Sequence, residues 1–95
     1  MHVHTVLLTF ADPIVVDALV RRMETMAGRI PGLIDVTVTR NEVEGPWSAD
    51  LALTTRFVDL DAYLAYRTDP VHEAVAAEVR ALMVDARTLD WTADP

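Results

Sequence analysis

The feature that most constrains this chain is the order in which two apolar periodicities follow one another. Apolar and polar residues alternate, as they do in strands, at residues 2–10, 34–39, 50–57 and 87–91. Apolar residues recur at spacings of three and four, as they do in helices, at residues 13–28 and 70–83. The sequence therefore predicts the order strand, helix, strand, strand, helix, strand.

Aspartate–proline pairs mark the start of both predicted helices. The carboxylates of Asp12 and Asp69 can each accept a hydrogen bond from a backbone N–H of the first helical turn. The proline that follows lacks a backbone N–H, which costs nothing at this position because that N–H would have no partner within the helix. Gly28, followed by a second Gly-containing turn, ends the first helix at about residue 28. Between residues 59 and 66 a short helix, capped by Asp59, should turn Leu60, Tyr63 and Leu64 inward.

The segment 41–49 contains Gly, Pro and Ser and is typical of a long hairpin loop. It also carries Trp47, which we expect to pack back on its own hairpin. A place at a pocket mouth or against a partner subunit is the alternative for this indole.

The predicted order is that of an α+β, ferredoxin-like βαββαβ fold in a single domain spanning residues 1–95. Right-handed crossovers would place both helices on one face of a four-stranded antiparallel sheet. The other face is then left bare, which favours pairing with a second copy of the chain as a homodimer. The candidate contact residues on that face are Val3, Leu7, Leu89 and Trp91.

Composition excludes several classes of protein. The 95 residues include 52% hydrophobic residues and no Cys, and no apolar run approaches the roughly 18 residues of a membrane span. The formal net charge is -7 and the eight basic residues are scattered arginines, so a nucleic acid would be repelled. We expect a cytoplasmic protein that binds neither a membrane nor a nucleic acid.

Four sequence segments together resemble the stress-responsive A/B barrel (Dabb) family. They are residues 4–10, the Ile-Pro-Gly at 30–32, the strand 50–57, and the stretch from Tyr63 to His72, in the family's order and spacing. The family signature before the second long helix usually reads His-Pro-x-His, whereas Asp69 replaces its first histidine here. The resemblance implies a dimeric α+β barrel with a small apolar pocket in each subunit.

The resemblance also implies candidate catalytic residues. Some plant members are polyketide cyclases that use residues at the positions of His72, Tyr66 and His4, but they carry a further histidine where Leu51 stands here. A histidine can remove a proton beside a carbonyl while a tyrosine hydroxyl orients that carbonyl. The pocket would need neither cofactor nor metal. Its expected apolar wall residues are Val6, Leu8, Met23, Leu51, Leu53, Val75 and Val79.

Structural roles compete with these assignments. His72 at the start of a helix can be a partly exposed residue bonded locally, Tyr66 a packing aromatic, and His4 a satisfied core histidine. His2 and His4 project from the same strand face and with His72 form an alternative three-histidine metal site.

Three functions remain open from the sequence alone. The first is a cofactor-free, polyketide cyclase-like lyase that closes a small hydrophobic carbonyl compound. The second is a non-catalytic dimer that binds such a ligand or has a structural role in stress, and the third is a cofactor-free monooxygenase. The fold cannot choose among them, because function resides in the site.

Overall fold

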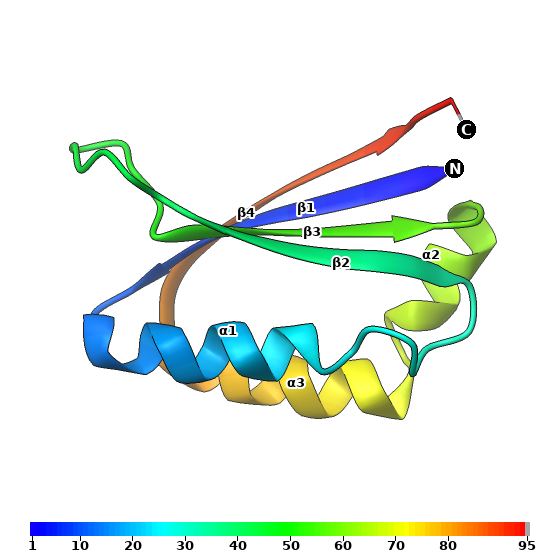
Figure 1. The fold of residues 1–95 in the computed structure, drawn as a ribbon, viewed down its shortest axis with the longest axis horizontal. Coiled ribbons are helices and arrows are strands. Elements are labelled where there is room, and N and C mark those ends of the chain that lie inside the picture. Colours follow the sequence, from blue (N-terminus) through cyan, green and yellow to red (C-terminus); the bar gives the residue numbers. More distant parts are fainter. Residues whose placement is uncertain (95) are drawn as a thin grey trace.

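The computed structural model describes residues 1–94 and contains one four-stranded sheet covered on one side by helices (Figure 1). The chain runs through β1 (His2–Phe10), a 3-10 turn (Pro13–Val15), α1 (Val16–Glu24), β2 (Leu33–Arg40), β3 (Leu51–Phe57), α2 (Leu60–Tyr66), α3 (Pro70–Leu82) and β4 (Met83–Thr92). The strand order is β2-β3-β1-β4 and every neighbouring pair is antiparallel. This is the predicted ferredoxin-like α+β fold.

Aspartates cap α2 and α3 as predicted, whereas Asp12 caps the 3-10 turn that precedes α1 and α1 itself has no side-chain cap. The carboxylates of Asp12, Asp59 and Asp69 each accept a backbone N–H of the turn that follows them. The first helix, however, ends at Glu24, four residues before the expected stop at Gly28. The N–H of Thr25 is shared between carbonyls three and four residues back, and from Met26 onward the backbone bonds span three residues, so the chain leaves the α-helix in tight turns before it reaches the glycine.

The last strand is longer than predicted. β4 begins at Met83, directly after α3, although Met83 was expected on the helix and the strand only from residue 87. Pairing with β1 extends from Phe10–Met83 to His2–Thr92. These long-range hydrogen bonds make residues 83–86 part of the strand although their local sequence does not predict one. The final residue, Pro95, lies outside the described residues.

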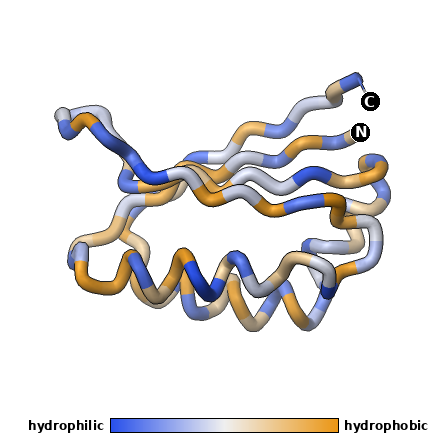
Figure 2. Tube along the Cα trace, in the orientation of Figure 1, coloured by the Kyte–Doolittle hydropathy of each residue, from blue (hydrophilic) through white to orange (hydrophobic). Residues whose placement is uncertain are grey.

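The core lies between the sheet and the helices. On β3 the alternation holds as predicted, with Leu51, Leu53, Thr55 and Phe57 buried, and Figure 2 shows apolar positions recurring along both layers. None of the described helices combines the length and the apolar run that a membrane crossing requires.

The short helix α2 is rotated relative to our prediction. Leu60 and Leu64 were expected to point inward but are 53% and 45% exposed. Tyr66 is buried and Tyr63 packs against the core, so the aromatic pair at a spacing of three determines which side of α2 faces the sheet.

The open face of the sheet matches the prediction at three of four positions. Leu7, Leu89 and Trp91 are exposed, but Val3, the fourth candidate contact residue, is only 1% exposed and has little surface left for a partner. Its cross-strand neighbours are Trp91 and Arg56, whose large side chains flank the small valine on both sides.

The hairpin loop between β2 and β3 projects beyond the sheet (Figure 1), and Trp47 on it is 96% exposed. The prediction that this indole packs on its own hairpin is therefore wrong. Side chains of Asn41 and Ser48 donate to the carbonyl of Val43, and these polar contacts close the loop without the indole.

Candidate functional site

A cavity of about 420 Å³ lies between the inner face of the sheet and the helices. Six of the seven apolar wall residues named from the sequence line it: Val6, Leu8, Met23, Leu53, Val75 and Val79. The seventh, Leu51, is 2% exposed and belongs to the packed core outside this cavity. Arg67 and Arg80, which sequence reasoning did not single out, also line it.

The three candidate polar residues His4, Tyr66 and His72 all line the same cavity. The chain breaks between α2 and α3 at Asp69, and this turn brings Tyr66 against His72 although they are six residues apart. Their ring centroids are 3.9 Å apart and the planes are inclined by 34°. The break therefore forms the pair that an unbroken helix would separate.

His72 presents one nitrogen to the cavity. Its Nδ1 is sealed from solvent and has no hydrogen-bond partner, which leaves Nε2 as the ring nitrogen that a ligand can reach. Burial lowers the pKa of His72, and the charges of Arg80 and His4 add to this effect, while the backbone of Arg67 and the charge of Glu73 oppose it. This lowered pKa favours the uncharged imidazole at neutral pH.

Tyr66 is a buried hydrogen-bond donor. Only 3% of the residue is exposed, and burial, followed by the influence of Tyr63, raises the pKa of its phenol. The hydroxyl donates to Sδ of Met26 at 3.9 Å. Because a thioether is a weak acceptor, this hydroxyl can exchange the sulfur for a carbonyl oxygen at little cost.

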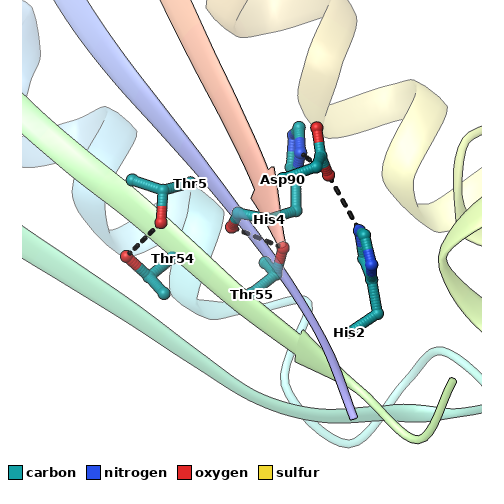
Figure 3. Close-up of polar contacts among 6 residues, drawn as sticks. All are labelled: His2, His4, Thr5, Thr54, Thr55 and Asp90. Atoms are coloured by element: carbon teal, nitrogen blue, oxygen red, sulfur yellow. Dashed lines mark hydrogen bonds and ion pairs between the residues drawn. The ribbon is translucent and has the colours of Figure 1, made fainter. Parts of the chain in front are cut away.

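Asp90 on β4 holds both N-terminal histidines (Figure 3). Its Oδ1 accepts from Nε2 of His2 at 2.9 Å and from Nδ1 of His4 at 2.7 Å. Burial raises the pKa of Asp90, but the hydrogen bonds and charges of the two histidines outweigh it and leave the pKa below its ordinary value. A proton on Nδ1 of His4 leaves its Nε2 as an acceptor, the arrangement found in carboxylate–histidine pairs.

Tyr63 covers this cluster from α2. Its ring centroid lies 4.8 Å from that of His2 and 4.7 Å from that of His4. Burial and the nearby Asp90 raise the pKa of Tyr63, and Arg67 partly opposes them. The sequence analysis predicted that Tyr63 faces the core but did not identify Asp90. The only feature that could have indicated Asp90 was its position as an acidic residue on the predicted last strand.

Threonines fix the strands beside His4. Thr55 is 0% exposed and donates its hydroxyl to the carbonyl of His4 at 3.3 Å. Thr5 and Thr54 share a hydrogen bond of 3.2 Å between the same two strands (Figure 3). These contacts hold β1 against β3 where the histidine projects.

The three-histidine metal site does not form. Within residues 1–94, no group of three or more His, Asp or Glu side chains is arranged to hold a metal ion. His2 and His4 direct one nitrogen each to Asp90 instead.

The fold is that of a ferredoxin-like α+β domain with a cavity between its sheet and helices. The chain belongs to the stress-responsive A/B barrel (Dabb) domain family, whose sequence model matches residues 3–93. A search of curated proteins finds no match.

Solved structures share this fold at low sequence identity. A dimeric ferredoxin-like protein from Bacteroides fragilis is 22% identical with a TM-score of 0.81, and the match covers 95% of this chain and 93% of that chain. A hydroxynitrile lyase from Passiflora edulis is 11% identical with a TM-score of 0.84, covering 98% and 93%. A mutant of SnoaB, a cofactor-independent oxygenase from Streptomyces nogalater, is 18% identical with a TM-score of 0.76, covering 99% and 92%.

Proposed function

We propose that this protein is a homodimeric enzyme that transfers protons on a small, largely apolar carbonyl compound without a cofactor, in the manner of an aldol-type polyketide cyclase. One observation carries the proposal: the uncharged His72 and the Asp90-bound His4 line the same apolar cavity. A neutral imidazole is a suitable base near neutral pH, and an apolar substrate that fills the cavity would displace the water that competes for that base.

In the proposed reaction His72 removes one proton from the substrate and later returns it to the product. Nε2 of His72 removes a proton from a carbon between two carbonyls while the Tyr66 hydroxyl donates to the carbonyl oxygen that gains charge. The resulting enolate carbon attacks a second carbonyl carbon of the same molecule, and the new C–C bond leaves an alkoxide. Protonated His72 returns its proton to that alkoxide, and His4 accepts a hydrogen bond from a substrate hydroxyl.

The dimer in this proposal rests on the open face of the sheet. Leu7, Leu89 and Trp91 are exposed there, and several solved structures with this fold are described as dimeric. A second sheet against this face would remove these apolar side chains from water. We propose that residues 1–95 act as one domain in this assembly.

Ligand binding without turnover is a second candidate. The observation that favours it is Leu51, which stands where the plant cyclases carry a histidine and is packed into the core away from the cavity. In this case His72 would contribute to affinity and the bound molecule would leave unchanged.

The experiment offers the purified protein a freshly prepared linear acid bearing three β-keto groups, with no metal or cofactor added. Chromatography and mass spectrometry measure the cyclised product, and an oxygen electrode measures the consumption of dissolved oxygen. We expect cyclisation without oxygen uptake, lost in His72→Ala and kept in the control Asp85→Asn, whose carboxylate lies outside the cavity. Equal cyclisation by His72→Ala would refute the role of His72, binding without product would favour the second candidate, and oxygen uptake would indicate a cofactor-free oxygenase.

A further inference from the structure

We infer that the ligand of this cavity is a carboxylate anion, held at the cavity rim by Arg67 and Arg80. This inference deepens the proposed function, because it names the charge of the molecule that the same cavity takes. It rests on which charges line the cavity, on how they are paired, and on where α3 places them.

The cavity contains only one sign of permanent charge. Arg67 and Arg80 are the only permanently charged side chains among residues 1–94 that line it, and no Asp or Glu of these residues does so. This contrasts with the whole chain, whose formal net charge is -7. A positive rim on an acidic protein attracts an anionic ligand to this opening and not to the rest of the surface.

Both arginines are free to bind a ligand. Among residues 1–94, the ion pairs of arginine are Arg22 with Glu78, Arg40 with Asp17 and Arg87 with Asp85, and none involves Arg67 or Arg80. Both residues are exposed, so their guanidinium groups remain hydrated until a ligand arrives. A guanidinium offers several N–H donors in one plane, which matches the two oxygens of a carboxylate.

The helix α3 aligns Arg80 with the proposed base. His72, Ala76 and Arg80 follow one another at a spacing of four and all line the cavity, so they occupy one face of α3. Helical side chains lean toward the helix N-terminus, which brings the guanidinium back toward His72. Its charge lowers the pKa of His72, as the geometry leads one to expect.

Arg67 lines the same cavity from the end of α2. It follows α2 directly, and its charge lowers the pKa of Tyr63, which lines the cavity beside His4. The inference places the ligand carboxylate at the two exposed arginine side chains and the apolar remainder of the ligand against Val75 and Val79, which line the same cavity.

Isothermal titration calorimetry with two matched probes tests the inference. Octanoate and octanamide have the same chain and nearly the same size, and only the first is charged. We expect octanoate to bind about tenfold more tightly, a difference of one exposed charge-assisted contact. Arg80→Gln and Arg67→Gln should each remove most of that preference and leave octanamide binding unchanged.

Arg21→Gln is the matched control, because Arg21 is exposed on α1, lies outside the cavity and forms no ion pair within residues 1–94. It should keep the full preference. Equal binding of the two probes, no binding of either, or a preference that survives both cavity variants would overturn the inference.

Binding and turnover separate this inference from the proposed function. Preferential octanoate binding by a protein that cyclises no β-keto acid would support the anion site and refute the enzyme. Cyclisation by a protein with no preference for octanoate would keep the enzyme and refute the anion site.

Discussion

Replacing Asp90 by Asn tests the histidine cluster on β1 and β4. The substitution keeps the size of the side chain but removes the charge from an oxygen that accepts bonds of 2.9 and 2.7 Å from His2 and His4. Hydrogen bonds to a charged group contribute about 1.5–3 kcal/mol each when well buried. The Asp90 side chain is 37% exposed, so water screens both bonds and we expect a total loss of about 1–2 kcal/mol.

The pH dependence gives this prediction a direction. The folded-state pKa of Asp90 lies below its ordinary value, because the bonds and charges of the two histidines outweigh the effect of burial. Its contribution to stability is therefore present above that ordinary value and is lost as the pH falls through about 4 and below. The stability difference between wild type and Asp90→Asn should narrow over that range.

The assay is equilibrium unfolding in guanidinium chloride at one fixed protein concentration, at neutral pH and at the lowest pH where the fold persists. Asp85→Asn on the same strand is the control, because its carboxylate makes only a surface pair with Arg87 at 3.8 Å. The control should lose less than about 0.5 kcal/mol. The reasoning fails if Asp90→Asn is as stable as wild type at neutral pH, or if the difference does not change in acid.

Three further predictions follow from the structure. Gly32→Ala should cost about 2–3 kcal/mol, because Gly32 has a φ of +79° and a Cβ there would lie 2.5 Å from Cβ of Ala62, while Gly45→Ala should be nearly neutral in the same unfolding assay; equal effects would contradict this. If the proposed dimer forms through the open sheet face, Leu89→Asp should convert it to a monomer in light scattering, because the substitution places a charge on that face. A dimeric mass that the substitution leaves unchanged would exclude that face as the interface. Burial lowers the pKa of His72, so the unfolded chain takes up its proton first and wild-type stability should fall relative to His72→Leu as the pH drops below about 6.5; a difference independent of pH would contradict it.

The fold could be predicted because its signals are local. The alternation on β3 and the carboxylate caps at Asp12, Asp59 and Asp69 each depend on a few neighbouring residues, and the structure confirms them. The same local break at Asp69 explains why Tyr66 and His72 meet. Where two local signals competed, as on α2, the burial of Tyr66 decided the rotation and left Leu60 exposed.

The remainder of the site depends on long-range pairing. Asp90 reaches His4 only because β4 pairs with β1 in a register that places these two residues directly opposite each other. The residues that neighbour Asp90 in the sequence do not determine that register. The burial of Val3 has the same origin, since its neighbours Arg56 and Trp91 come from two other strands. The two arginines at the cavity rim could be chosen from the eight in the chain only once α2 and α3 were placed over the sheet.

The central claim is that His72 stands uncharged at the wall of a ligand cavity with Nε2 open to it. Nitrogen NMR of the labelled imidazoles, recorded during a pH titration with and without octanoate, tests it most directly. The account predicts a pKa for His72 below its ordinary value and a shift of its Nε2 resonance when octanoate binds. A ring that is charged at neutral pH, or an Nε2 signal that does not change while octanoate binds, would contradict it.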